Sequence, residues 1–439
     1  MTRRVALANH LVLVGVLCGI IQIISATWLV TWHDTPNASL KIARNILQDG
    51  RYEGGYWALL RGPSVQPGRD EPRFFQLPGE ALYLAFWFRI LPEKMQRYVH
   101  VPVTVALVTS VTYVGALLGG PWLGLGTGIL ASVQPFVILH GPVWDDTFLT
   151  AALVWMVAGM LCGALGVCGG RTAPRREYSP WWFFALACGV IVASLTRMQA
   201  QVVFLVMAGT ALAVPQLRRA RVAATVMMLS VALAVVSWGV RNVAVTGEFT
   251  MSSSHDGIAL LLSNGPHTRK AILCGQVDAC AVAESLGEHW RRIAGLKEGE
   301  IDSYYRTQAI KYMKAHPVDV LITGAFKLGI SLLGIRPEVS LVSLRNVGAI
   351  ASSLVLYALA TWGFYLLKLS LPKQVGSIVG WLFGVIGIVV IGMLIFGPIG
   401  IRYRLMLDSI MWIGGAAALV DWCKRRGCCL EEASRESVP

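Results

Sequence analysis

The sequence predicts an all-α polytopic membrane protein with about ten transmembrane helices, interfacial helices and extracytoplasmic loops. Of its 439 residues, 55% are hydrophobic and only 14% are charged, whereas a soluble domain carries roughly a quarter charged residues. The mean hydropathy is +0.59. Apolar runs of about 20 residues, the length that crosses a bilayer, recur along the chain, and the first extends from Leu11 to Trp32.

Apolar runs place the expected spans as follows. They cover residues 11–32, 99–118, 121–139, 147–168, 180–197, 200–216, 222–241, 346–368, 376–397 and 404–421. Two further apolar stretches, 77–91 and 318–335, are short or interrupted by charged residues and glycines. We interpret both as interfacial helices that lie in the membrane plane, the alternative being that both cross.

Basic residues decide between these alternatives. The net charge is +13, and the basic clusters lie in short loops beside the spans: residues 171–178, 218–221 and 423–426, with Lys368 and Lys373. Cytoplasmic loops carry an excess of Lys and Arg, and all these clusters fall on one side only if both ambiguous stretches stay in the plane. The pattern predicts a multi-pass protein of the plasma (inner) membrane and no nucleic-acid partner.

This topology divides the chain into three parts. Residues 1–241 form an N-terminal transmembrane module whose first outer loop covers 33–98. Residues 242–316 form an extracytoplasmic soluble segment, and 317–439 a C-terminal transmembrane module with a cytoplasmic tail.

Two amphipathic helices are expected outside the membrane. Leu40, Ala43, Ile46 and Leu47 recur at helical spacing in the first outer loop. The segment 301–315 has a similar pattern and ends before a proline, which stops a helix.

Acidic residues lie at the predicted outer ends of two spans. Asp34 follows the first span, where it either ends the helix as an interfacial polar residue or carries out chemistry. Asp145 and Asp146 precede the span at 147–168, and one of them can cap that helix. The other is left for a metal, an acceptor or an arginine partner.

Four arginines, Arg197, Arg241, Arg402 and Arg404, border the same surface. Arginines at a membrane interface often act only as anchors whose charged groups reach the water. Their planar guanidinium groups also bind phosphate oxygens in a bidentate manner, so a phosphate carried by a lipid is the alternative ligand.

Cys274 and Cys280 are the only cysteine pair in the extracytoplasmic segment, and an oxidising compartment predicts a disulfide between them. The sequence contains no P-loop, no dinucleotide-binding glycine motif, no HExxH and no GxSxG motif. Nucleotide-dependent and zinc-protease chemistry are therefore unsupported.

Six segments, in order, resemble the GT-C class of membrane glycosyltransferases, in particular the branch of bacterial protein O-mannosyltransferase-like enzymes and lipid A aminoarabinose transferases. They are IARNILQDGRY (42–52), DDTFLT (145–150), GVIVASLTRMQ (189–199), the stretch from WGVRN to SNGP (238–266), AIKYMKAHPVDVLITGAFKLG (309–329) and RYRLML (402–407). The resemblance covers most of the chain. The sequence departs from the family in lacking an Asp-Glu pair in the first loop and prolines after RYR.

The resemblance implies transfer of a sugar from a polyprenyl-phosphate donor to the hydroxyl of a lipid, glycan or protein acceptor outside the cytoplasm, with inversion. Asp34 would act as the catalytic base, because a hydroxyl needs a carboxylate to take its proton. Arg197, Arg241, Arg402 and Arg404 would bind the donor phosphate. Asp145 and Asp146 would bind the acceptor or a divalent metal, Mg²⁺ or Mn²⁺, which is the one cofactor left open.

Two other classes remain as alternatives. A polytopic transporter or lipid flippase of the cell envelope would place charges along a pathway at the membrane midplane, usually between related halves, and no such repeat is evident. A non-catalytic scaffold would not need acids and arginines at the same surface.

Overall fold

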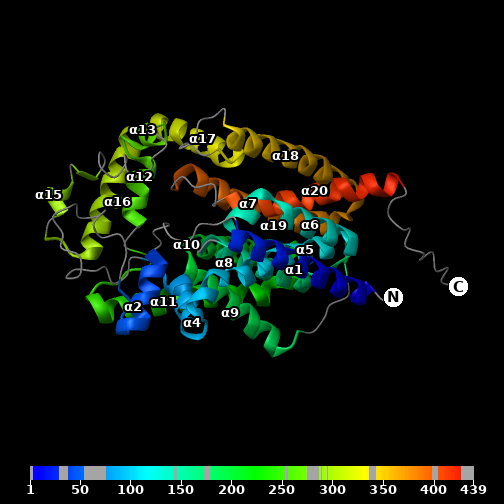
Figure 1. Ribbon diagram of the computed structural model, residues 1–439, viewed down its shortest axis with the longest axis horizontal. Coiled ribbons are helices and arrows are strands. Elements are labelled where there is room, and N and C mark those ends of the chain that lie inside the picture. The colour runs from blue at the N-terminus through cyan, green and yellow to red at the C-terminus, as the bar shows by residue number, and fades with distance from the viewer. Residues whose placement is uncertain are drawn as a thin grey trace.

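The computed structural model describes residues 3–28, 38–53, 76–142, 146–172, 178–251, 253, 256–273, 286–287, 289–293, 295–335, 343–397 and 404–426. Long helices lie side by side along the longest axis of the molecule, and shorter helices gather at one end of them (Figure 1). Both the start of the first helix and the end of the last helix lie at the opposite end.

Seven helices within the described residues are long and apolar enough to cross a membrane, judged by length and composition. They are α1 (Arg3–Trp28), α5 (Val101–Gly119) with the 3-10 turn η1 (Glu93–Tyr98) before it, α8 (Asp146–Ala164), α11 (Arg221–Thr246), α18 (Leu344–Ser370), α19 (Lys373–Phe396) and α20 (Leu405–Arg425). An eighth span results if α16 (Glu298–Ala315) and α17 (Pro317–Leu333), which meet at 104°, are counted together. The chain is an all-α polytopic membrane protein, as predicted, while the count of about ten spans stays a prediction.

Shorter apolar helices account for the other predicted spans: α6 (Pro121–Val133), α9 (Pro180–Thr196) and α10 (Met198–Ala213). The stretch 121–139, predicted as one span, is broken into α6 and α7 (Pro135–His140). Pro135 lacks a backbone N–H, and Gln134 before it is extended, with its side-chain oxygen accepting from the N–H of Val137 at 2.9 Å. A new helix therefore starts there.

The two ambiguous stretches form α4 (Pro78–Ile90) and α17. The 13 residues of α4 measure about 20 Å and the 17 residues of α17 about 25 Å. Both are shorter than the hydrocarbon core of about 30 Å. Their length suits the in-plane interpretation, which stays a prediction.

Short helices cover one end of the bundle. The amphipathic helix expected in the first outer loop is α2 (Ala38–Asp49), whose Ala43 packs in a cluster with Leu84 and Phe88 of α4. The helix expected at 301–315 is part of α16, which packs against α12 (Asp256–Asn264) through a core that includes Ile258 and Tyr305. The helices α13 (Thr268–Leu273) and α15 (Trp290–Ile293) lie near them.

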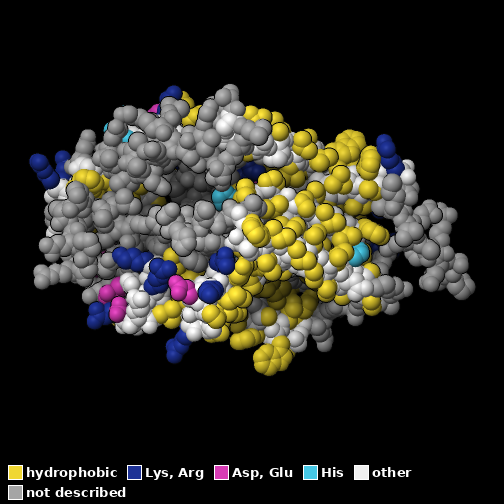
Figure 2. Space-filling view, viewed as in Figure 1, with side chains coloured by type: hydrophobic (Ala, Val, Ile, Leu, Met, Phe, Trp, Pro, Cys, Tyr) yellow, Lys and Arg dark blue, Asp and Glu magenta, His cyan; other side chains and the backbone are white. Residues whose placement is uncertain are grey.

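The membrane helices meet these short helices at a surface that we call the rim. It comprises the C-terminal ends of α1, α9 and α11 and the N-terminal ends of α5, α8 and α10. The hydroxyls of Thr27 in α1 and Tyr98 in η1 lie 3.1 Å apart, and Thr104 of α5 donates to the carbonyl of Gly141 at 2.9 Å. Figure 2 shows charged side chains near α2 and α4 and apolar side chains over the long helices.

The opposite ends of the helices form the basic face. A two-stranded hairpin of β1 (Val167–Cys168) and β2 (Arg171–Thr172) lies there, and the N–H of Gly170 donates to the carbonyl of Leu117 at 3.0 Å. The 3-10 turn η2 (Pro215–Ala220) joins α10 to α11 at the same level. Described basic residues of this face are Arg171, Arg219, Arg221, Lys368, Lys373, Lys424, Arg425 and Arg426.

Candidate active site

An ion pair between Asp146 and Arg197 lies at the centre of the rim. Asp146 is the first residue of α8, and Arg197 is the single extended residue between α9 and α10. A guanidinium N–H of Arg197 donates to a carboxylate oxygen of Asp146. The side chains are 10% and 19% exposed for Arg197 and Asp146, so water screens this pair only weakly. Two of the residues predicted as site residues thus meet, and the pairing gives Asp146 the arginine partner that the sequence left open.

Arg241 lies at the same rim, near the C-terminal end of α11. Its guanidinium donates to Asn242 Oδ1 at 3.1 Å and to the backbone carbonyl of Tyr52 at 3.3 Å. The rings of Tyr52 and Trp238 each lie 5.0 Å from its guanidinium carbon. These cation–π contacts and hydrogen bonds hold the planar guanidinium of Arg241 in one orientation.

An apolar cluster connects Arg241 to the Asp146–Arg197 pair. Trp238 and Leu77 are buried in it, and Tyr52 and Leu195 pack against them. Leu195 precedes Arg197 by two residues. α4 approaches the end of α9 so closely that a Cβ on Gly79 would lie 2.8 Å from the Cα of Thr196. The cluster therefore joins Tyr52 and Trp238, the two aromatic residues beside Arg241, to the end of α9 that precedes Arg197.

Electrostatic interactions extend across this cluster to two glutamates. Burial raises the pKa of the Tyr52 hydroxyl well above its ordinary value of 10, and the charge of Arg241 opposes this shift. The negative charges of Glu298 and Glu80 raise the pKa of Tyr52 further. The hydroxyl of Tyr52 donates to the carbonyl of Gln76 at 2.8 Å, and it must be protonated to do so.

Glu80 and His100 are rim residues that sequence reasoning did not single out. Both are buried, with Glu80 Oε1 lying 3.8 Å from His100 Nε2, between α4 and α5. Tyr83 packs its ring edge-on against His100 and donates to the carbonyl of Val99 at 2.6 Å. The available signal was a glutamate inside an apolar stretch and a histidine at the start of the next predicted span, because a buried carboxylate requires a partner.

The donors of Arg404 point into the protein. This residue is 3% exposed and donates through Nε to Asp408 at 2.8 Å. Its Nη1 donates to the carbonyls of Leu332 at 2.7 Å and Ser331 at 3.2 Å, at the end of α17. Ser353 Oγ lies 3.1 Å from the same nitrogen. This arrangement joins α20 to α17 and α18, and its contacts are protein groups rather than a free surface for phosphate.

Several predicted site residues lie outside the described residues: Asp34, Asp145, Arg402, Cys274 and Cys280. α1 carries the chain to the rim before Asp34, and Asp145 directly precedes Asp146 in the sequence. The roles given to these five residues, including the disulfide, stay predictions.

The acids considered as metal ligands are Asp34, Asp145 and Asp146. Among the residues that the structure describes, no group of three or more His, Cys, Asp or Glu side chains could hold a metal ion. Two of the acids considered as metal ligands, Asp34 and Asp145, are not in this set, and the third, Asp146, has its charge matched by Arg197.

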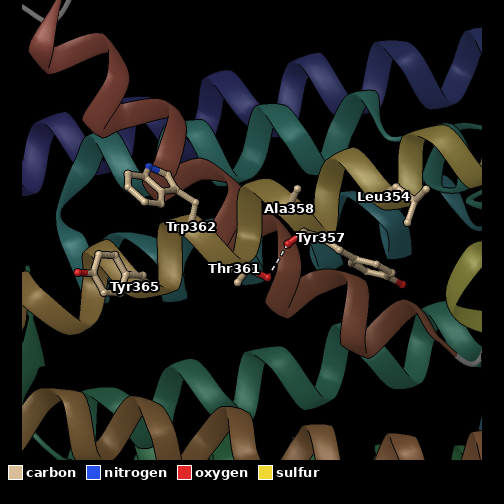
Figure 3. Close-up of a pocket in the computed structure, with 6 residues that line it drawn as sticks. All are labelled: Leu354, Tyr357, Ala358, Thr361, Trp362 and Tyr365. Carbon is tan, nitrogen blue, oxygen red and sulfur yellow. Dashed lines mark hydrogen bonds between the residues drawn. The ribbon is translucent and has the colours of Figure 1, made fainter.

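A groove on α18 is separate from the rim. Six residues on one face of this helix line it, with a volume of about 810 Å³: Leu354, Tyr357, Ala358, Thr361, Trp362 and Tyr365 (Figure 3). The hydroxyl of Thr361 donates to the carbonyl of Tyr357 at 2.8 Å, and that of Tyr357 to the carbonyl of Leu332 at 2.8 Å. The groove is lined mainly by apolar surface, and no Asp, Glu, Lys, Arg or His is among its six lining residues.

No model of a known protein family matches the chain, and a comparison with curated proteins finds no match. The helices define an all-α, multi-pass membrane protein with a packed, charged rim.

Proposed function

We propose that this protein is a glycosyltransferase that moves a sugar from a polyprenyl-phosphate donor to an acceptor hydroxyl. The observation that carries the proposal is that the Asp146–Arg197 ion pair and Arg241 lie at the same end of the membrane helices. A lipid-borne donor presents its phosphate at that depth, and a water-borne or lipid-borne acceptor can reach it from the other side. The ordered resemblance to GT-C enzymes supports the same class.

The chemistry divides between acid and arginine. In a single displacement the acceptor oxygen bonds to the anomeric carbon as the bond to the phosphate oxygen breaks, and the hydroxyl proton passes to a carboxylate. We assign Asp34 as the carboxylate that accepts this proton. The leaving lipid phosphate is already anionic and requires positive charge rather than an acid. Arg241 supplies it in this proposal, together with Arg402.

The contacts of Arg197 and Arg404 support other roles for these two residues in the proposal. Arg197 is matched by Asp146, so the pair suits a positioning role, holding α8 next to the break between α9 and α10. Arg404 is engaged by Asp408 and the end of α17, so we omit it from the phosphate site. Asp145 is left as the residue that orients the acceptor or binds a divalent metal.

The charge distribution supports an extracytoplasmic active site in the plasma (inner) membrane. The basic residues named above lie at the ends of the helices opposite the rim. The excess of Lys and Arg in cytoplasmic loops then assigns the basic face to the cytoplasm and the rim to the outside.

A transfer assay with Asp34→Asn tests the proposal. The protein in nanodiscs is supplied with radiolabelled polyprenyl-phosphate hexose or pentose and with membrane lipid, glycan and peptide acceptors. Asp34→Asn keeps the shape of the side chain and removes its basicity, so turnover should fall by roughly 10²-fold or more with donor binding unchanged. Asp145→Asn should have a smaller effect, and Asp421→Asn on the basic face serves as the matched control.

Activity near that of the unchanged protein in both Asp34→Asn and Asp145→Asn would overturn this mechanism. Donor lipid that crosses the bilayer with no sugar transferred would favour the flippase alternative.

A further inference from the structure

Lys327 is a fully buried lysine in the middle of α17, and the proposed chemistry does not use it. Its ammonium donates to the carbonyl of Ser263 at 2.9 Å and to that of Gly397 at 3.0 Å. Ser263 is the penultimate residue of α12, and Gly397 follows the last residue of α19. Carbonyls at helix C-terminal ends lack intrahelical partners and carry partial negative charge, so one ammonium stabilises two helix ends.

A second side chain makes the same connection. Asn264, the last residue of α12, donates through Nδ2 to the carbonyl of Phe396 in α19 at 2.7 Å. α17 packs so closely on this end of α19 that a Cβ on Gly324 would come within 2.6 Å of Ile395 Cγ2. The ends of α12 and α19 are thus held together at α17.

The opposite end of α12 is connected to Arg241. Asn242, which accepts from Arg241, donates through Nδ2 to the carbonyl of Thr250 at 3.0 Å. Ser253 then donates to Asp256 Oδ1 at 2.9 Å at the start of α12. The nine residues of α12 form a helix of about 14 Å between this end and Lys327.

We propose that Lys327 is a positioning residue: by fixing the far end of α12 to α19, it keeps Asn242 and therefore the Arg241 guanidinium oriented toward the donor phosphate. This proposal rests on the proposed function for its kinetic consequence, but its structural part stands on the contacts alone. Asn264 acts in the same junction, so the two residues work as one unit.

Hydrogen exchange of the protein in nanodiscs tests the structural part. Lys327→Met removes the ammonium while filling its volume, and an apolar replacement of a buried charged group is often tolerated. Exchange should become faster in α12 and in residues 242–250. Asn264→Leu should do the same, and the double variant should add little to either change. Lys311→Met, at an exposed lysine of α16, is the control and should leave exchange unchanged.

Unchanged exchange of residues 242–250 in both single variants would overturn the positioning role, whatever the enzyme activity. If the effects of the two variants on exchange add in full, Lys327 and Asn264 do not act as one unit, and the inference of a single junction is overturned.

Donor kinetics test the part that depends on transfer. Lys327→Met should raise the KM for the polyprenyl-phosphate donor by about 3- to 30-fold with kcat nearly unchanged. In an Arg241→Ala background it should raise KM no further, because Lys327 acts through that arginine. An equal rise in both backgrounds would overturn the inference. If the unchanged protein transfers no sugar, the proposed function fails, and the exchange result still decides whether Lys327 positions Asn242.

Discussion

At the scale of single residues, two arginines that look alike in sequence occupy different environments. Arg241 lies 5.0 Å from the centres of two aromatic rings at the rim, whereas Arg404 is buried against Asp408 and two carbonyls. Each borders a span and each could anchor at an interface or bind phosphate. The contacts show that the Nε and Nη1 donors of Arg404 are bonded to Asp408 and to the end of α17, which leaves little of this guanidinium for a ligand.

The buried position of Arg404 leads to a prediction about stability. Arg404→Lys should lower the apparent Tm, because a lysine cannot reach Asp408 and the end of α17 with one planar group. The loss should be about 2–4 kcal/mol, as for a buried pair left partly unmatched. Thermal unfolding in detergent measures it. The KM for donor should stay unchanged in the folded fraction, and a large rise in KM without loss of Tm would return Arg404 to the phosphate site.

The Asp146–Arg197 pair allows a double-mutant cycle. Arg197→Met should leave Asp146 as an uncompensated carboxylate and lower stability by about 2–4 kcal/mol, and Asp146→Asn should act in the same direction. The double variant should be more stable than the sum of the single losses implies, because it buries no unmatched charge. Denaturation of all four proteins gives the coupling energy. Strict additivity would show that the two groups do not interact in solution.

At the scale of elements, the contact of α4 with α9 depends on a glycine. A Cβ on Gly79 would meet the backbone of Thr196 at 2.8 Å, and backbone atoms cannot move aside as a flexible side chain does. Gly79→Ala should therefore lower stability by about 1–3 kcal/mol and reduce transfer. Gly209→Ala in α10, where no atom lies within 4 Å of the added carbon, is the matched control and should be neutral or slightly stabilising. Equal Tm values for the two variants would refute the close contact.

Helices were predictable from the sequence where periodicity and breakers agree. The stripe of Leu40, Ala43 and Ile46 predicted α2, and Pro317 predicted where α16 ends. The break at Gln134–Pro135 was missed because the apolar run continues through it, although the proline was a signal for a break. A hydropathy profile shows where an apolar run lies and how long it is, but it is not changed by the loss of one backbone hydrogen bond at a proline.

The candidate site was predictable as a set of charges but not as a set of pairs. The sequence placed Asp146, Arg197 and Arg241 at one surface because all three border spans. Their partners depend on which helices are neighbours in space, as with Arg241 and Tyr52, which are 189 positions apart in sequence. Glu80 and His100 were missed because the meaning of a polar residue in an apolar stretch depends on the packing around it.

At the scale of the whole molecule, the two ends of the helices differ in charge and in the structure that covers them. The rim is covered by α2, α4, α12 and α16, whereas the basic face carries short connections such as the β1–β2 hairpin and η2. This asymmetry suits a protein with its chemistry on one side of the bilayer. In the proposed orientation, the basic face lies in the cytoplasm.

Reporter fusions test the threading that this asymmetry implies. Ala173 and Lys297 are separated by α9, α10 and α11. If all three helices cross, the two positions lie in opposite compartments, and this also holds if α9 and α10 together form a hairpin that enters and leaves on one side. We therefore expect a fusion at Ala173 to report the cytoplasm and one at Lys297 to report the outside, as the basic loops predict.

A fusion at Arg218 should report the same compartment as the fusion at Ala173, since only α9 and α10 separate the two positions. A common compartment for Ala173 and Lys297 would place the rim and the basic loops on the same side of the membrane, and the extracytoplasmic active site would have to be abandoned.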